Sequence, residues 1–283
     1  MPRTEQAMPE PRPLIFGEVL YDRFQDGACT LGGAPFNVAW HLQAFGLAPL
    51  MVSRVGNDAL GQQVLAAMQS WGMDCSGMQV DHAHATGVVE VTLDQGEPHY
   101  HIVESQAYDF IAVAQLPRIR GDTLLYHGSL ACRSTATAET LAELKRLLRG
   151  KVFVDINLRA PWWDRQQALQ MLADARWIKL NAEELGSLLP QLDGEEARIA
   201  ALLHHALDYA VVTRGDQGAS AMLARGRQRH DLRPAATTVI DAVGAGDAFC
   251  SVLILGELRH WPLPLTLQRA QQFASAIVGK LGR

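Results

Sequence analysis

Cysteine is scarce in this chain of 283 residues, and the four that occur, Cys29, Cys75, Cys132 and Cys250, lie far apart and form no CxxC pair. This spacing argues against a zinc knuckle or a redox dithiol and favours reduced thiols in a reducing compartment. The sequence also lacks the run of about 18 apolar residues that a membrane-spanning helix needs. Residues 1–13 lack the apolar core of a signal peptide. We therefore expect a cytoplasmic protein whose residues 1–13 form a disordered tail.

Net charge is small as well. The chain has 25 Lys and Arg against 30 Asp and Glu, which gives a formal net charge of -5. A weakly acidic protein has no general positive field to attract nucleic acid or anionic lipid. The ten histidines include no HExxH motif, so a protein-held zinc site is not expected. Small molecules remain as partners, and any anionic substrate must be held by local groups.

Apolar segments recur along the chain at lengths typical of buried strands and helices. Strands are predicted at 14–22, 49–56, 122–129, 151–157, 176–181 and 209–215, and helices at 31–46, 57–72, 135–149 and 195–207. Strands that alternate with helices in this way indicate a parallel sheet covered on both faces, with ligands at the carboxyl ends of the strands. We expect one α/β domain over residues 14–283.

Residues 86–105 break this pattern. Apolar and polar residues alternate there on both sides of a Gly-containing turn, which predicts an antiparallel hairpin with one solvated face. With residues 23–31, the hairpin is expected to form a small β-sheet lid over the end of the first strand. The alternative is an edge hairpin that merely caps the sheet. His101 on this hairpin either faces the substrate or lies on the surface.

The stretch DAVGAGDAFCS, from Asp241 to Ser251, places two aspartates around a Gly-Ala-Gly turn that runs into an apolar helix. Gly244 and Gly246 keep side chains away, so successive main-chain N–H groups can converge at the positive end of that helix. Asp247 falls in the first helical turn, where a simple capping role is common. A cap alone requires neither two glycines nor a second carboxylate, so the joint pattern favours an anion hole with an acid beside it.

This pairing of an anion hole and an acid suits phosphoryl transfer. Main-chain N–H groups neutralise charge on the moving phosphoryl group, and a carboxylate takes the proton of the attacking hydroxyl. The motif is not a P-loop, because no GxxxxGK[ST] occurs. It is not a dinucleotide fingerprint either, because Phe249 occupies the third glycine position.

Several motifs together resemble the ribokinase-like (PfkB) family of sugar kinases. DAVGAGDAF is similar to the C-terminal signature of that family, and GGAPFNVA at 32–39 is similar to its N-terminal glycine signature. VGNDALG, DINLR, KLNAEEL and VTRGDQG follow in the family's order, so the resemblance covers most of residues 14–281. It implies a three-layer α/β/α fold with a mostly parallel central sheet and a small β-sheet lid. Among the subfamilies, GEVLYD, GGAPFN and DINLRAPWW most resemble fructokinases.

The resemblance also implies roles for residues of the C-terminal signature. By it, Asp247 is the catalytic base, and the main chain of Gly244, Ala245 and Gly246 forms the anion hole. Asp241 and the carbonyl of Val243 resemble the family's monovalent-cation site, which implies K⁺ next to that hole.

Further contacts are implied at the ends of other predicted strands. The resemblance implies sugar-hydroxyl contacts for Asp22, Gly32, Gly33 and Asn37, nucleotide contacts for Thr213 and Gly215, and water-mediated positioning of magnesium and phosphate for Asn181 and Glu184. Each role has a structural alternative. Asp22 is alternatively a loop aspartate, the two glycines form a plain tight turn, and Asn181 and Glu184 form a capping box.

Asp155, Asn157 and Arg159 alternate after a predicted strand, so we expect them to point one way into a cleft. Asn157 and Arg159 are therefore predicted substrate contacts. Arg159 either reaches the sugar or a phosphate, or forms a structural ion pair.

The sequence thus predicts an ATP-dependent kinase that transfers the γ-phosphate to a hydroxyl of a small carbohydrate, with Mg²⁺ and K⁺ as cofactors. Fructose is the first expected acceptor. Another sugar, a nucleoside or a keto-deoxy sugar acid is the alternative, because the guanidinium of Arg159 suits a carboxylate. The alternative class is an inactive sugar- or nucleotide-binding sensor. A homodimer formed through the lid is compatible with catalysis.

Overall fold

The structure is a computed structural model that describes residues 12–94, 97–119, 123–148, 151–203, 206–225, 227–233 and 244–278. Residues 1–11, most of the predicted tail, lie outside the described residues. Arg12 already belongs to the packed structure, because its Nη2 lies 2.6 Å from Asp74 Oδ2. Among the helices in these ranges, none combines the length and the apolar character of a bilayer-spanning segment.

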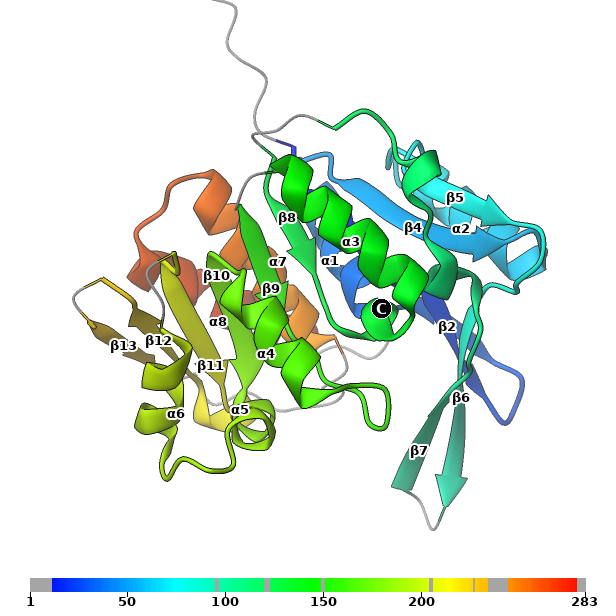
Figure 1. The fold of residues 1–283 in the computed structure, drawn as a ribbon. Coiled ribbons are helices and arrows are strands. Elements are labelled where there is room, and N and C mark those ends of the chain that lie inside the picture. The colour runs from blue at the N-terminus through cyan, green and yellow to red at the C-terminus, as the bar shows by residue number, and fades with distance from the viewer. Residues whose placement is uncertain are drawn as a thin grey trace, which may run out of the picture.

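A nine-stranded sheet forms the centre of the molecule, in the order β13-β12-β11-β10-β9-β8-β1-β4-β5 (Figure 1). Neighbouring strands from β11 to β5 pair in parallel, whereas β12 and β13 add an antiparallel edge. The predicted mostly parallel sheet is confirmed, but the antiparallel edge was not among the predicted strands. The strands are β1 (Leu14–Phe16), β4 (Leu50–Gly56), β5 (Met78–Asp81), β8 (Leu125–His127), β9 (Val152–Asp155), β10 (Trp177–Asn181), β11 (Tyr209–Thr213), β12 (Ala219–Leu223) and β13 (Arg229–Leu232).

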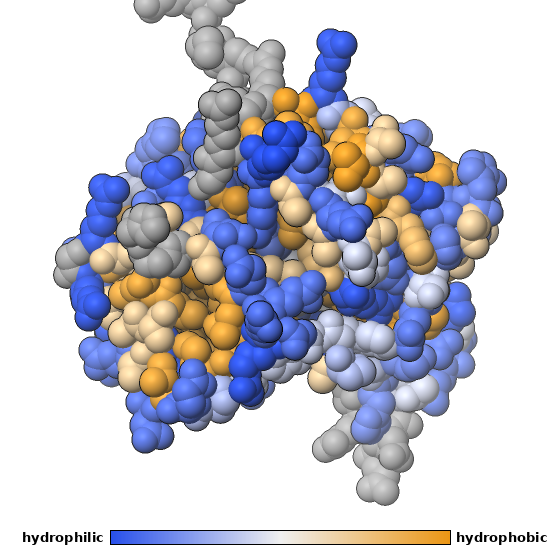
Figure 2. Space-filling view, viewed as in Figure 1, coloured by the Kyte–Doolittle hydropathy of each residue, from blue (hydrophilic) through white to orange (hydrophobic). Residues whose placement is uncertain are grey.

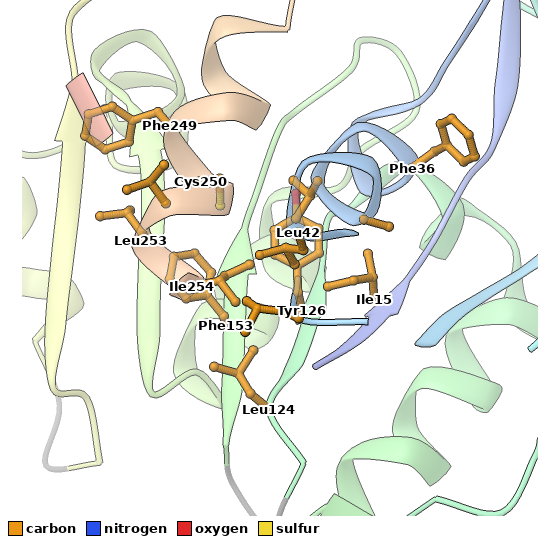
Figure 3. Close-up of a cluster of buried hydrophobic side chains, with 14 of the residues drawn as sticks. Ile15, Phe36, Leu42, Leu124, Tyr126, Phe153, Phe249, Cys250, Leu253 and Ile254 are labelled. Atoms are coloured by element: carbon orange, nitrogen blue, oxygen red, sulfur yellow. The ribbon is translucent and has the colours of Figure 1, made fainter. Parts of the chain in front are cut away.

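Helices cover both faces of this sheet, which gives the expected three layers. Two separate clusters of buried apolar side chains lie between the layers, one under each set of helices. Figure 3 shows part of the cluster between the sheet and α1 and α7, where Ile254 lies beside Phe153 and Phe249 lies further along α7. One face carries α1 (Ala34–Ala44), α2 (Ala59–Ser70), α7 (Ala245–Leu258) and α8 (Leu263–Val278), and the other carries α3 (Thr135–Leu148), α4 (Arg165–Ala173), α5 (Ala182–Leu188) and α6 (Glu195–Leu202).

A second, four-stranded sheet projects from the edge of the body (Figures 1 and 2). It is called the small sheet below, and its order is β3-β2-β6-β7. The predicted hairpin at 86–105 is confirmed as β6 and β7, which pair antiparallel and do not join the large sheet. The strands are β2 (Leu20–Phe24), β3 (Cys29–Gly32), β6 (Gly87–Asp94) and β7 (Glu97–Ile102).

The predicted first strand at 14–22 is wrong, because the chain leaves the large sheet after Phe16. Gly17 has φ 146, and a Cβ on it would lie 2.5 Å from Pro35 Cγ, so only glycine fits this turn. Residues 17–19 then link β1 in the large sheet to β2 in the small sheet. Asp22 therefore lies on the small sheet, paired with Thr30, and not at the end of a central strand.

Candidate functional site

The N-terminus of α7 is built as the sequence predicts. Gly244 precedes the helix in a left-handed conformation, φ 80 and ψ -3, which glycine adopts at little cost. The first helical turn follows at Ala245, and Gly246 is exposed. The main-chain N–H groups of the first turn lie at the positive end of the helix dipole. No bulky side chain at Gly244, Ala245 or Gly246 covers them. Asp241 and Val243, the predicted cation ligands, lie outside the described residues.

Asp247 in this first turn meets the N-terminal glycine segment. The side-chain amide of Asn37 on α1 donates a hydrogen bond to Asp247 Oδ2 at 2.7 Å, across 210 positions of sequence. Both side chains are half-buried. The two signature segments, far apart in the chain, therefore meet in the fold, and the Asn37 amide holds one oxygen of the Asp247 carboxylate.

Gly33 sets the approach of α1 to the segment that joins the two sheets. Its φ is 104, and a Cβ on it would lie 2.8 Å from the carbonyl oxygen of Glu18 and 3.3 Å from the Cα of Val19. Gly32 ends β3 opposite Leu20. Gly33 thus allows close packing of main chain on main chain at the same place where a ligand was expected to approach.

Glu18 lies in this segment and was missed by the sequence reasoning. Only 3% of the residue is exposed, and its Oε2 has no hydrogen-bond partner among the described residues. Burial raises the pKa of Glu18 to about 7; the Arg159 guanidinium opposes the rise, and the Asp247 carboxylate adds to it. The signal in the sequence was a glutamate between apolar residues in GEVL.

The predicted alternation of Asp155, Asn157 and Arg159 is wrong. The strand β9 ends at Asp155, and Asn157 has φ 46, so the two-residue period of a strand no longer applies. Asp155 is fully buried and contacts Lys179, whereas Arg159 is exposed and donates from Nη1 to the carbonyl of Leu158 at 3.1 Å. Arg159 still lies close enough to lower the pKa of Glu18.

Asn181 and Glu184 form the capping box that the sequence left open as an alternative. Asn181 Oδ1 accepts from the Glu184 N–H, and Glu184 Oε2 accepts from the Asn181 N–H, both at 2.8 Å. Glu184 Oε1 also accepts from the Leu158 N–H at 2.9 Å, which fixes the loop after β9. Burial raises the pKa of Glu184, and Lys179 opposes that rise.

A magnesium ion would therefore find few free protein ligands here. Within the described ranges, no three His, Cys, Asp or Glu side chains gather as a metal-binding group. Both oxygens of Glu184 already accept main-chain N–H groups. Mg²⁺ usually keeps several waters and is held by phosphates with one or two carboxylates. The residues present would fit such a phosphate-held ion, with Glu184 acting through water.

Thr213 and Gly215 lie beside this capping box. Thr213 ends β11 directly opposite Asn181 in the parallel pairing, and Gly215 follows with φ 55. Both are accessible to solvent. His101, by contrast, is exposed on β7 at the edge of the small sheet. The ends of β10 and β11 thus bring together the residues that were expected to contact the nucleotide.

A buried ion pair that the sequence reasoning did not single out completes the site. Lys179 Nζ lies 3.0 Å from both carboxylate oxygens of Asp155. The pair lies between β9 and β10, under the first turn of α7, because a Cβ on Gly246 would lie 3.3 Å from Lys179 Nζ. The signal was a single lysine inside the apolar strand WIKLN.

Comparison with known proteins places these features in a family context. The profile of the family described as "pfkB family carbohydrate kinase" matches residues 10–283. A fructokinase from Klebsiella pneumoniae is 32% identical over 265 residues, which cover 87% of this chain and 84% of that protein.

Solved structures of similar fold include two fructokinases. The crystal structure of fructokinase with bound ATP from Xylella fastidiosa has a TM-score of 0.86 and 23% identity, and the match covers 96% of this chain and 93% of that chain. A double-mutant fructokinase from Vibrio cholerae O395, solved with fructose, ADP and a potassium ion, has a TM-score of 0.79 and 23% identity, covering 97% of this chain and 91% of that chain. At these identities the likeness shows the ribokinase-like fold.

Proposed function

The chain belongs to the pfkB family of carbohydrate kinases, and from this premise we propose that it transfers the γ-phosphate of ATP to a hydroxyl of fructose. Membership of the family makes it a phosphotransferase that acts on a sugar hydroxyl. Fructose as the acceptor is supported by the similarity to the Klebsiella pneumoniae fructokinase.

The observation that carries the proposal is the Asn37–Asp247 hydrogen bond at the glycine-lined start of α7. In the proposed step, the acceptor hydroxyl oxygen bonds to the γ-phosphorus, and the bond from that phosphorus to the β,γ-bridging oxygen breaks. ADP leaves with the electron pair, and the hydroxyl proton moves to Asp247. The N–H groups of Gly244, Ala245 and Gly246 face the charge that develops on the phosphoryl oxygens.

The remaining site residues divide between the two substrates. Asp22 on the small sheet and the glycines at 32 and 33 lie on the acceptor side, where Asn157, Arg159 and His101 are also proposed to contribute. Thr213, Gly215 and Asn181 lie on the nucleotide side, at the ends of β10 and β11. The hydrogen bond from Asn37 to Asp247 supports this division, because it joins α1, on the acceptor side, to α7.

Cofactors and assembly extend the proposal. We propose Mg²⁺ bound to the nucleotide phosphates, with Glu184 acting through water, and K⁺ at Asp241 and the Val243 carbonyl. The potassium ion in the Vibrio cholerae fructokinase supports the second ion. We also propose a cytoplasmic location and a homodimer formed through the small sheet, which carries the exposed apolar side chains of Phe24 and Tyr100.

A coupled assay of ADP release with fructose, other sugars and nucleosides, in the presence of Mg²⁺ and K⁺, tests the proposed function. Asp247→Asn should lower turnover by at least ~10²-fold, the usual scale for a general base, while sugar binding survives. Asp193→Asn, at an exposed aspartate before α6, is the matched control and should keep wild-type turnover. If no acceptor stimulates ADP release while ligands still raise the Tm, the chain is a binding protein.

A further inference from the structure

The ion pair between Lys179 and Asp155 is unusual in its burial. Asp155 is fully buried and Lys179 is 7% exposed, at paired positions of β9 and β10. Removing two charges from water costs more than many such pairs return, and apolar side chains of similar size often stabilise a fold equally well. Stability alone therefore does not account for a lysine in the middle of this strand.

The ion pair lies close to the start of α7. Lys179 Nζ approaches Gly246 in the first helical turn. Cys250 lies four residues further along, so it shares that face of the helix one turn deeper, within the buried cluster drawn in Figure 3. Burial raises the pKa of the Cys250 thiol, and the Asp155 carboxylate adds to the rise, while Lys179 opposes it. The ammonium thus lies next to the first turn of α7.

The position of the ammonium has an electrostatic consequence. It lies beside the first turn of α7, at the positive end of the helix dipole, so its field adds to that of the dipole at the main-chain cradle. The lysine also remains charged. Burial alone would lower the pKa of Lys179, but the facing Asp155 carboxylate more than offsets this, and the pKa lies above its usual range.

We propose that Lys179 is a positioning residue for phosphoryl transfer, whose ammonium supports the first turn of α7 from behind and strengthens its attraction for the charge on the transferred phosphoryl group. Asp155 holds the ammonium in place. A Cβ on Gly246 would lie 3.3 Å from the ammonium, so the first turn and Lys179 are in close contact. The inference rests on the proposed function, since it requires that phosphoryl transfer take place at α7.

The test compares two double variants that each remove one ion pair. Asp155→Asn/Lys179→Met removes the buried pair without leaving a lone charge. Arg176→Met/Asp208→Asn removes the pair at the opposite end of β10, where Arg176 Nε and Asp208 Oδ2 are 2.7 Å apart. Lys179→Gln is the second variant at the site, because its amide can still donate to Asp155. For each protein we would measure kcat, both KM values and the Tm.

We expect the Asp155→Asn/Lys179→Met protein to fold and to lose at least ~10-fold in kcat, somewhat less than removal of a direct transition-state donor costs. Both KM values should stay within about threefold, because the ground-state contacts remain. Lys179→Gln should show the same kcat defect, and the control pair should keep wild-type kcat.

The proposal is overturned if the folded site variants keep kcat within about twofold of wild type, or if their kcat falls only as far as the control's. A wild-type protein that releases no ADP with any acceptor would instead overturn the proposed function, so the two failures can be told apart.

Discussion

The buried carboxyl of Glu18 makes a sharp prediction for how stability depends on pH. In the unfolded chain this group loses its proton near its ordinary value of 4.5, whereas in the folded protein burial raises its pKa to about 7. Between these values the folded state binds more protons than the unfolded state, so the contribution of Glu18 to stability falls as pH rises through this window. At about 1.4 kcal/mol for each pKa unit, the ionised group costs the fold about 3 kcal/mol above pH 7.

The substitution Glu18→Gln removes this titration and keeps the shape of the side chain. We expect the variant, relative to wild type, to be about 3 kcal/mol more stable at about pH 8 than it is at about pH 4.5, in urea unfolding followed at several pH values. Glu90→Gln, at an exposed glutamate on β6, is the control and should give a difference that does not change with pH. A flat difference for Glu18→Gln as well would refute the reasoning, because it would mean that Glu18 titrates alike in the folded and unfolded chains.

Two further predictions concern the close main-chain contact at Gly33 and a second buried ion pair, between Arg133 and Asp109. Gly33→Ala should raise the sugar KM at least ~10-fold, since its Cβ would meet the Glu18 carbonyl oxygen at 2.8 Å and strained main chain of this kind costs on the order of 1–3 kcal/mol. Gly27→Ala is the control, because Gly27 has φ 87 but open space around it. Equal KM values for the two variants would contradict the packing argument. Arg133→Met should lower the free energy of unfolding, measured by urea unfolding, by about 3–5 kcal/mol, because it leaves the buried carboxylate of Asp109 without its charge partner. In the wild-type protein two guanidinium nitrogens of Arg133 each lie 2.8 Å from an oxygen of this carboxylate. A loss below about 1 kcal/mol would instead place this pair with ordinary surface pairs.

Local signals predicted the elements of the fold well. Continuous apolar runs located the parallel strands except β5, and two glycines before an apolar helix located the start of α7. The spacing of Asn181 and Glu184 offered a capping box as one of two alternatives, and the structure shows that box. These features depend on neighbours within a few residues, and so they can be predicted without knowledge of the tertiary structure.

Long-range geometry could not be predicted in the same way. The turn at Gly17 moves Asp22 to the small sheet, and this turn requires glycine because Pro35, on α1, occupies the space beside it. The left-handed conformation of Asn157 ends the alternation expected after β9. The Lys179–Asp155 pair depends on the pairing of two strands, and only the lysine among apolar residues gave a hint of it.

The contact between Asn37 and Asp247 also has a consequence for the making of the protein. Its two partners are separated by 210 positions, and a ribosome releases the N-terminal partner long before it synthesises the other, at about 5–20 residues per second. A nascent chain that has emerged only as far as β11 has the glycine segment but no acid to complete it. By the proposed role of Asp247, phosphoryl transfer requires that α7 has been synthesised, and fragments from premature termination before α7 should consume no ATP.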